Sequence, residues 1–508
     1  MSSTVTVGLL VVIVLYLAMM VTIGVYYSKK TENVGDFYLG GRKLGPLVTA
    51  MSAEASDMSS WLLLGLPGLA YITGVADPGW TAIGLAVGTY FNWLLVSKRL
   101  RRYSAKVGAI TIPDFFAKRF HDKGKMLLGV SALIIVIFFV PYTASGFAAC
   151  GKLFGTLFDI PYMPAMIGSA VIIVAYTTLG GFLAASTTDL IQSIIMTVAL
   201  VIVVVFGISL SGGLAAVIDN AKALSGYLTL TDSYDVGTKT SHPYGVLTAC
   251  STLAWGLGYF GMPHILLRFM GTEDENKLKI SRRIATIWVV ISMTIAIFIG
   301  IIGYSISLEG HIEMFTDTAH SETLIIRIAM LLSQHGVIVI VLAGLILAGI
   351  LACTMSTSDS QLLAASSSVS ENLLREVFGI KLSKKGSMIV ARATVIVIAV
   401  IGIVLASDQN SSVFNIVSFA WAGFGASFGP VMLFSLFWKR TNRFGAFAGM
   451  IVGGAMVFIW KYLVRPMGGI LDIYELLPAF LCAGIVIVIV SLLTPAPEQE
   501  VIKEFENI

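Results

Sequence analysis

Charged residues are scarce in this chain. Only 12% of its 508 residues are Asp, Glu, Lys or Arg, about half the share of a typical soluble domain, whereas 56% are hydrophobic. Several stretches of roughly 20 residues carry little or no charge, which is the length that a helix needs to cross the hydrocarbon core of a bilayer. The composition therefore predicts an all-α polytopic membrane protein. The long continuous apolar runs argue against a β-barrel, because its strands alternate apolar and polar residues.

Patterns typical of catalysis and of metal binding are also missing. The cysteines (Cys150, Cys250, Cys353 and Cys482) lie in or beside apolar segments without metal-ligand spacing, and the six histidines are scattered. HExxH, P-loop and GxSxG patterns are absent, so we expect neither an enzyme nor an organic cofactor. The basic runs lie between apolar segments, where they set orientation, so nothing indicates a nucleic-acid partner.

The chain does contain a long series of apolar segments. Hydropathy predicts thirteen spanning helices, at about residues 5–27, 46–72, 79–97, 126–150, 163–180, 189–211, 243–267, 284–307, 334–366, 388–406, 412–437, 444–462 and 476–494. The first of these segments lacks a basic n-region before it and a small-residue cleavage site after it. We therefore expect a membrane helix there and not a signal peptide.

The basic residues predict the orientation of the chain. If the N-terminus lies outside, all but six of the 33 Lys and Arg fall on the inner side of the membrane. The six that remain outside are Lys152, Lys222, Lys239, Arg327, Lys461 and Arg465. This asymmetry predicts a multi-pass plasma-membrane protein with an outer N-terminus and a cytoplasmic C-terminus. The longest outer loop, about residues 212–242, is polar and is expected to cover the protein as a lid or cap.

Two apolar segments contain glycine and proline where a continuous helix would not. They read SAEASDMSSWLLLGLPGLAY (52–71) and STLAWGLGYFGMPHIL (251–266). Broken backbone at membrane depth survives where it is buried in protein or lines a cavity. Each broken segment is the first of five, so the two sets run in opposite directions, which is typical of a transport site between inverted repeats. The alternative is that Gly and Pro are simply common in membrane helices. The matching positions favour the transport site.

Polar residues form three groups that could bind a cation. They are residues 55–60, the run Ser356, Thr357, Asp359 and Ser360, and Asp189. Sodium takes several oxygen ligands, and a broken helix frees carbonyl oxygens to supply them. Helix packing through small residues is the other interpretation of the Ser/Thr run. Asp57 and Asp359 lie deep enough to need partners, whereas Asp189 lies near the end of a predicted segment.

Aromatic residues on the second broken segment could form the walls of a small pocket. Trp255, Tyr259 and Phe260 lie there in mid-span beside glycines, and Tyr142 follows Pro141 in the segment 126–150. Such rings supply an apolar face with a few hydrogen-bonding groups, as small-molecule sites require. Interfacial anchoring or core filling is the alternative role of aromatic residues in membrane proteins.

Five stretches resemble the sodium/solute symporter family, and most closely its bacterial sodium/proline members. They are YLGGRKLGP (38–46), SDMSSWLLLGLPG (56–68), WGLGYFGMPHILLRFM (255–270), MSTSDSQLLAASSSVSENL (355–373) and AWAGFGASFGP (420–430). The resemblance implies one transporter domain over 1–508 with a LeuT-type 5+5 inverted-repeat core. That core would span 46–440, between an extra helix and loop at 1–45 and two extra helices at 441–495, with a cytoplasmic tail at 496–508.

The resemblance also implies roles for individual residues. Sodium would be bound by the carbonyls of Ala55, Met58 and Cys353 and by the hydroxyls of Ser356 and Thr357. Asp57 matches an acid that the family needs for sodium coupling. Substrate contacts would come from Asp57, Ser59, Ser60, Tyr142, Trp255, Tyr259 and Pro263. Arg42 matches a functionally sensitive arginine on the cytoplasmic path.

Two acids depart from the family pattern. Glu54 stands where Gly is expected, and Asp359 stands where Ser is usual. Some members of the family have a second sodium site, which would correspond here to Asp189, Ser356, Asp359 and Ser360. Asp359 would strengthen cation binding there, or bind a proton. Glu54 lies about 4–5 Å along the helix from Asp57 on the cytoplasmic side. We expect it to line the inner path or to pair with a basic residue.

The sequence and its resemblance to the family therefore predict a sodium-coupled symporter that imports a small amino acid by alternating access. L-proline is the expected substrate. Another small solute or proton coupling is the alternative within transport. A transporter-like sensor is a different class, but sensor relatives carry long cytoplasmic domains, and this chain has only a short tail. A channel and a membrane enzyme have less support, because the polar groups gather at mid-span without a catalytic constellation. The expected partners are a small-molecule substrate, sodium as coupling ion and the lipid bilayer; the sequence does not define an oligomeric state.

Overall fold

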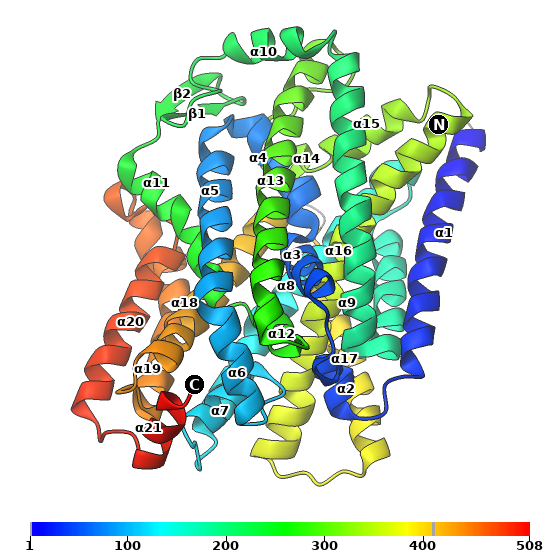
Figure 1. Cartoon of the computed structure of the whole chain (residues 1–508). Helices are drawn as coiled ribbons and strands as arrows, with labels where there is room; N and C mark the ends of the chain where they lie inside the picture. The colour runs from blue at the N-terminus through cyan, green and yellow to red at the C-terminus, as the bar shows by residue number, and fades with distance from the viewer. Residues whose placement is uncertain (1–2, 409–411) are drawn as a thin grey trace.

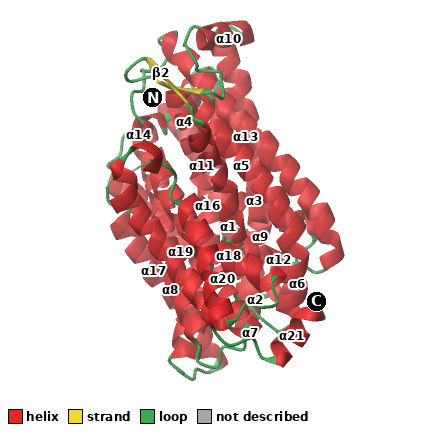
Figure 2. Ribbon diagram, turned by 90° about the vertical axis from the view of Figure 1, so that its left-hand side faces the viewer, coloured by secondary structure: helices red, strands yellow, loops and turns green. Residues whose placement is uncertain are grey.

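The protein is a bundle of helices that pack side by side (Figure 1). The computed structural model describes residues 3–408 and 412–508. A short two-stranded hairpin lies at one end of the bundle, beside helix α10, and the rest of the picture is helices and loops (Figure 2). The two ends of the chain lie at opposite ends of the molecule.

Nine helices of the described residues are long and apolar enough to cross a membrane. They are α1 (Ser3–Ser28), α8 (Met126–Phe158), α9 (Tyr162–Leu210), α13 (Leu278–Leu308), α16 (Val337–Ser367), α17 (Lys384–Leu405), α18 (Val413–Phe437), α19 (Arg443–Ile459) and α20 (Leu476–Leu493). Each lies where hydropathy predicts a span. The total of thirteen spans stays a prediction.

Element α9 contains the two helices that the sequence places at 163–180 and 189–211, but the loop expected between them is missing. The two helices meet at Gly181, which has φ 64° and ψ −160°. A Cβ atom at Gly181 would lie 2.8 Å from Cδ2 of Phe37, on the neighbouring helix α2 (Val34–Leu39). A glycine kink therefore replaces the expected loop, because the chain needs both a positive φ and a close helix contact at this point.

Both segments with internal glycine and proline are broken, as the sequence predicts. The first consists of α3 (Pro46–Ser60), the π-helical turn η2 (Trp61–Gly65) and α4 (Leu66–Thr73). The second consists of α11 (Val246–Leu253), the 3₁₀ stretch η4 (Ala254–Phe260) and α12 (Pro263–Gly271).

The second broken segment lies directly against α5 (Ala76–Phe91), which continues into η3 (Asn92–Ser97). A Cβ atom at Gly88 would lie 2.3 Å from the carbonyl oxygen of Gly256, so only glycine permits this backbone approach.

One end of the molecule carries the predicted cap, and we call it the cap end. The cap contains α10 (Leu214–Lys222) and the antiparallel strands β1 (Asp232–Asp235) and β2 (Thr240–Pro243), which pair Asp232 with Pro243. Backbone hydrogen bonds fix it to the end of α4: the amide of Val75 donates to the carbonyl of Tyr227 at 2.8 Å, and that of Val236 donates to Ile72 at 3.2 Å.

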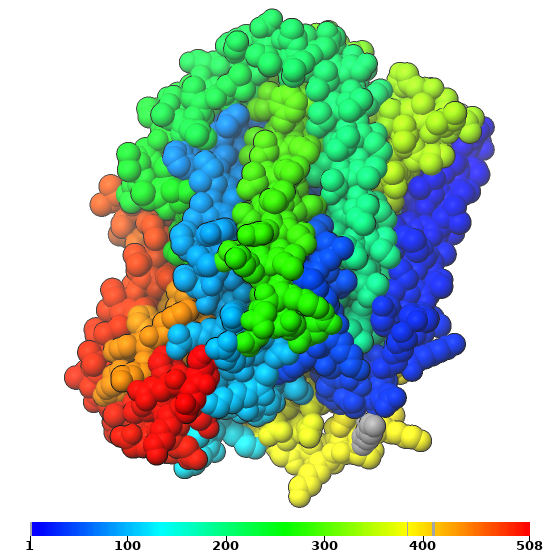
Figure 3. Space-filling model, viewed as in Figure 1, coloured from blue at the N-terminus to red at the C-terminus, as the bar shows by residue number. Residues whose placement is uncertain are grey.

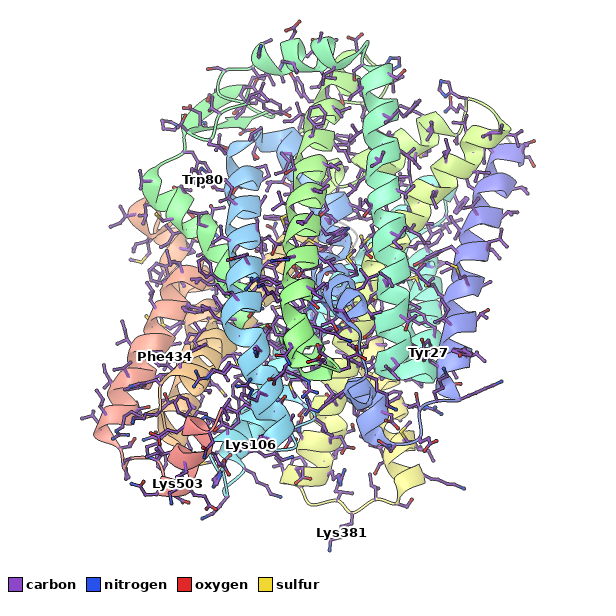
Figure 4. All side chains as sticks on the ribbon, viewed as in Figure 1. Tyr27, Trp80, Lys106, Lys381, Phe434 and Lys503 are labelled. Carbon is purple, nitrogen blue, oxygen red and sulfur yellow. The ribbon has the colours of Figure 1, made fainter. Side chains whose placement is uncertain are left out.

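The opposite end, which we call the basic end, carries α2, α6 (Lys98–Lys106), α7 (Ile112–Arg119) and α21 (Gln499–Glu506). Figure 4 shows Lys106, Lys381 and Lys503 at this end and Trp80 near the cap. The predicted tail forms α21, which packs on the α6–α7 region (Figure 3). The ring of Phe505 lies 5.1 Å from the Arg99 guanidinium carbon and 5.0 Å from that of Arg119.

The remaining helical elements are short and connect the long helices. They are η1 (Gly40–Arg42), η5 (Glu275–Lys277), α14 (Thr318–Ser321), α15 (Leu324–Leu332), η6 (Ser368–Val377), η7 (Trp460–Val464), η8 (Arg465–Met467) and η9 (Gly469–Leu471).

Three polar residues lie deeper in the protein than the sequence predicts. Lys152 and Arg268 count as loop residues by hydropathy, but α8 and α12 extend past them, and both are buried. Asp189 is fully buried within α9, because no loop separates the two halves of that helix. Hydropathy ended these segments too early because a charged residue lowers the window average wherever it lies.

Candidate functional site

The break in the first segment begins at Ser59. Ser59 has φ 47° and ψ −173°, a backbone conformation that L-residues rarely adopt and that costs about 1–3 kcal/mol. The amide of Trp61 donates to the Ser59 hydroxyl at 3.1 Å and also to the Met58 carbonyl. The helix therefore loses its regular hydrogen bonding next to the residues predicted to bind sodium.

Four of the five predicted sodium ligands lie together. The Ser356 hydroxyl donates to the carbonyl of Ala55 at 2.8 Å and to that of Cys353 at 3.2 Å, and the Thr357 hydroxyl donates to Cys353 at 3.3 Å. All four residues are buried. Two carbonyl and two hydroxyl oxygens at one point, between α3 and α16, match the chemistry of a sodium site. The fifth residue, Met58, follows one turn later on α3.

Asp57 lies on the other side of the same turn and faces the second broken segment. The hydroxyl of Tyr259 donates to Oδ2 of Asp57 at 2.5 Å, and the hydroxyl of Tyr142 donates to the Asp57 carbonyl at 3.4 Å. The partner that an acid at this depth requires is therefore a tyrosine from η4. The two broken segments meet through this hydrogen bond.

A small cavity of about 10 Å³, almost filled by the side chains around it, lies between the two breaks. It is lined by Asp57, Met58, Trp61, Leu85, Tyr142, Trp255, Val417 and Trp421. Trp255 forms the centre of an aromatic group: its ring stacks on Trp61 at a centroid distance of 5.9 Å and on Tyr474 at 5.1 Å. One acid among several aromatic faces suits a small solute that carries both an ammonium group and an apolar body.

The cavity includes some of the predicted substrate residues and adds others. Asp57, Tyr142 and Trp255 line it, as predicted. Tyr259 does not line the cavity but donates a hydrogen bond to Asp57, which does. Ser59, Ser60 and Pro263 lie at the breaks and do not line the cavity.

Sequence reasoning missed four lining residues, Trp61, Leu85, Val417 and Trp421. Trp421 lies in the glycine-rich stretch 420–430, and this stretch is the sequence signal that could have identified it as a site residue. Its indole nitrogen donates to the carbonyl of Trp255 at 2.7 Å. The ring also covers Gly258, where a Cβ atom would lie 1.9 Å from that nitrogen.

The residues predicted for a second cation site also lie together, around an arginine that sequence reasoning placed in a loop. Arg268 contacts Asp189, with 3.1 Å between Nη2 and Oδ2, and also donates to the Ser360 hydroxyl. Asp359 accepts from Ser360 at 3.0 Å and from the Tyr176 hydroxyl at 2.8 Å. The sequence predicts that Asp359 needs hydrogen-bonding partners, and two hydroxyl groups are these partners.

Glu54 is buried one turn from Asp57, and its partner is not a basic residue. The indole nitrogen of Trp93, on η3, donates to Oε1 of Glu54 at 3.0 Å. Its second oxygen, Oε2, has no hydrogen-bond partner among the described residues. The alternative of a basic partner is therefore wrong, and a role on the inner path stays a prediction.

Contacts close the protein at its basic end. Arg42 donates to the carbonyls of Met270 and Ala109, each at 2.6 Å, and so joins the start of α3 to the end of α12 and to the loop after α6. The backbone of Leu44 pairs with Gly271 and Glu273 at the same place. Burial lowers the pKa of Arg42 to about 10, which leaves the guanidinium charged at neutral pH.

A buried ion pair closes the cap end. Lys152 on α8 lies 2.7 Å from Glu322, between α14 and α15. Glu322 also accepts from the amide of Phe414 at 3.1 Å and from the Ser412 hydroxyl at 3.0 Å, at the start of α18. One carboxylate therefore joins three elements above the cavity.

A fold with two broken segments, a buried cluster of oxygens and a small cavity between the breaks is typical of an ion-coupled secondary transporter. The structure superposes on a substrate-bound, outward-open Na⁺-coupled sialic acid symporter with a TM-score of 0.79 at 18% identity, covering 97% of this chain and 99% of that one. This likeness shows the fold, and it confirms the LeuT-type architecture predicted from the sequence.

The chain belongs to the sodium:solute symporter family, whose model matches residues 37–453. The sodium/proline symporter of Haemophilus influenzae is 43% identical over 502 residues, which are 98% of this chain and 97% of that protein. The osmoregulated proline transporter OpuE of Bacillus subtilis is 41% identical over 486 residues, 96% of this chain and 94% of that protein. The family consists of membrane transporters and not of enzymes, and sodium is their coupling ion.

Proposed function

We propose that this protein is a sodium-coupled symporter that imports L-proline. The observation that carries the proposal is the arrangement at the two breaks, where a cluster of oxygens, one acid and an aromatic cavity lie within a turn of one another. Relatives that are about 40% identical over nearly the whole chain are sodium/proline symporters and proline transporters by name, which supports proline as the substrate.

In this proposal the ion and the solute occupy adjacent sites. Sodium binds the carbonyls of Ala55, Met58 and Cys353 and the hydroxyls of Ser356 and Thr357. Binding requires the two hydroxyl groups to rotate, because each now directs its hydrogen at a carbonyl. Two hydroxyls and three carbonyls carry no net charge, which favours moderate affinity and reversible release.

The substrate would occupy this cavity once its aromatic walls move apart, with its ammonium group toward Asp57. The pyrrolidine ring would pack against Trp255 and Tyr142, where it replaces water on aromatic faces. The carboxylate would face the positive ends of the half-helices and the field of the bound ion. Sodium would then raise the affinity for proline by electrostatic attraction, and proline would raise that for sodium by the same factor.

The closed ends support transport by alternating access. We infer that the contacts of Arg42 and of Glu322 open in turn, so that the cavity reaches one side at a time. The cap end would face outside and the basic end the cytoplasm, because Lys and Arg concentrate at the latter. The whole chain would then act as one transporter domain with an outer N-terminus. The energy for the change would come from different ligand affinities in the two states.

Counterflow in proteoliposomes tests this function. Vesicles that contain the purified protein and unlabelled proline are diluted into labelled proline with sodium or with choline in its place. We expect labelled proline to accumulate only with sodium, and the vesicles without protein serve as the control. Equal accumulation in the two media would remove sodium coupling from the proposal.

A further inference from the structure

An apolar groove of about 470 Å³ lies on the outer face of the bundle, between the first half of α9 and α17. Its rims include Val171 and Val400, which are 60% and 54% exposed, whereas Ala170 and Ala399 at its floor are buried. Because alanines form the floor, the two helices leave a space between them that their own side chains do not fill. A groove of this kind on a membrane-spanning face is open to the chains of lipids.

The two helices run antiparallel along the groove. The hydroxyl of Tyr162, at the start of α9, donates to the carbonyl of Ala406, just past the end of α17, at 2.7 Å. Helix α17 begins at the basic end, a few residues after Lys381 in Figure 4. From Arg392 to Ile403 this helix rises about 16 Å, roughly half of the 30 Å hydrocarbon core of a bilayer. The groove therefore has the length of one leaflet.

Two cations of α17 lie at the basic end of the groove. Arg392 is one turn before the lining residue Ile396, and Lys385 lies two turns before Arg392 on the same face of the helix. Arg392 is half-buried, and its Nε atom is enclosed without a hydrogen-bond partner among the described residues. Neither side chain has a hydrogen bond or an ion pair within the part of the chain that the structure describes. An arginine at the edge of the membrane core requires a partner, and a phosphate group matches its donors.

A second apolar groove provides an internal comparison. It lies between α18 and α20 and has a similar volume of about 420 Å³. The cations near its basic end have partners in the protein: Arg440 donates to the carbonyl of Thr494 at 2.9 Å, and Lys439 lies 3.2 Å from Glu506. Two cations without partners therefore distinguish the groove between α9 and α17.

We propose that the groove between α9 and α17 binds one anionic phospholipid. An acyl chain lies against Ala170 and Ala399, and the phosphate accepts hydrogen bonds from Arg392 and Lys385. A zwitterionic lipid binds less tightly, because the ammonium group of its headgroup offsets the negative charge that the two cations attract. None of these residues belongs to the ion or solute site, so the inference goes beyond the proposed function and does not depend on it.

A second copy of the chain fits this groove less well than a lipid. Two copies in a membrane would be related by a twofold axis along the membrane normal. Such an axis places the two Arg392 side chains, and likewise the two Lys385 side chains, at the same height. The contact would then gather four positive charges without a counter-ion, which is costly when they are removed from water.

Lipid binding to the purified full-length protein tests the site. Native mass spectrometry in detergent counts the lipid molecules that the protein retains when phosphatidylglycerol or phosphatidylcholine with the same acyl chains is added. We expect the first phosphatidylglycerol to bind at about tenfold lower concentration than the first phosphatidylcholine. Equal binding of the two lipids would overturn the proposal. Because the readout is lipid binding, a failure of sodium-coupled transport would leave this result unaffected.

Removal of the two cations tests the headgroup contact. The double variant Arg392→Gln with Lys385→Gln should lose the tenfold preference for phosphatidylglycerol. The matched control is Lys279→Gln with Arg283→Gln, which removes two exposed cations at the start of α13 and should keep the preference. A preference that survives in the first variant, or that is lost equally in both, would overturn the assignment to Arg392 and Lys385.

A substitution that fills the groove tests the acyl-chain contact. Ala175 is an exposed lining residue, so Ala175→Trp occupies the groove, leaves the buried floor intact and keeps both cations. We expect it to lose the preference as well, whereas Ile485→Trp in the second groove should keep it. An unchanged preference in Ala175→Trp would show that no acyl chain lies in the groove. A dimer of the unaltered protein that Ala175→Trp converts to a monomer would assign the groove to a second copy and also overturn the proposal.

Discussion

In the proposed site, single residues separate an ion part from a solute part. Asp57 belongs to both, because its backbone lies between the carbonyls of Ala55 and Met58 while its carboxylate reaches across to Tyr259. Trp255 belongs to the solute part alone: its ring lines the cavity, and its carbonyl is held by Trp421. The two residues should therefore respond differently to substitution.

Asp57→Asn should raise the sodium concentration for half-maximal uptake by about 10- to 100-fold. The reason is the loss of a charge-assisted hydrogen bond and of a negative charge beside the ion, worth about 1.5–3 kcal/mol. The measurement is initial uptake of labelled proline over a range of sodium concentrations. Tyr259→Phe, which removes the hydroxyl but leaves the acid, should shift sodium dependence less. An unchanged sodium requirement in Asp57→Asn would contradict this role.

Trp255→Ala should weaken proline binding by about tenfold or more, since loss of a central aromatic contact typically costs 2 kcal/mol or above. The sodium requirement at saturating proline should change little, because no hydrogen bond among the described residues joins Trp255 to the proposed sodium ligands. Labelled-proline binding measured at several sodium concentrations separates the two effects. Equal shifts in proline and sodium affinity would show that the division between ion and solute parts is wrong.

At the scale of elements, one carboxylate links three parts of the chain at the cap end. Glu322 joins α8, through Lys152, to the first turn of α18, where it accepts from the amides of Val413 and Phe414. Both partners of the ion pair are buried, with exposures of 8% and 0%. Removal of one partner from such a pair typically costs about 3–5 kcal/mol, which is enough to shift a balance between closed and open states.

Glu322→Gln should therefore open the cap end. Phe414 packs on Trp255 below this ion pair, so a single cysteine at Phe414 in a cysteine-free background reports access to the cavity. We expect a membrane-impermeant thiol reagent to label it several-fold faster in Glu322→Gln.

Glu313→Gln is the matched control. It breaks the nearby Glu313–Arg327 pair, which is far more exposed and contributes about 0–1 kcal/mol. Equal labelling in both variants would show that Glu322 does not hold this end closed.

The sequence predicts the elements well where hydropathy and glycine act locally. Gly65, Pro67 and Pro263 inside apolar runs predict the two broken segments. The second break lies directly before Pro263, whereas the first begins at Ser59, before the π-helical turn that ends at Gly65. The bend in α9 was less accessible, because Gly181 reveals itself only through its contact with Phe37, which is distant in the sequence.

The residues of the site also divide into those that local sequence patterns reveal and those that only the fold reveals. Ser356, Thr357 and Asp57 could be named from local patterns and the family resemblance. The partner of Glu54 could not, because Trp93 reaches it from another element.

At the scale of the whole molecule, the sequence does not predict which charged residues are buried in the fold. The tail predicted at 496–508 forms α21 and covers Arg119, a residue that hydropathy counts as part of a solvated loop. Arg268 is the same case inside the bundle. A sum of basic residues indicates which end faces the cytoplasm, but it does not separate an arginine in a loop from one that balances a buried acid. Only the packing of α3, α9, α12 and α16 makes that distinction.

The central claim is that sodium and proline bind together at the two breaks, and one measurement tests it most directly. Equilibrium binding to the purified protein is measured for a panel of labelled amino acids, with sodium and with choline. We expect proline to bind most tightly and to lose most of its affinity, about tenfold or more, when sodium is removed. Tighter binding of another amino acid would contradict the substrate, and equal proline binding in both media would contradict the coupled site.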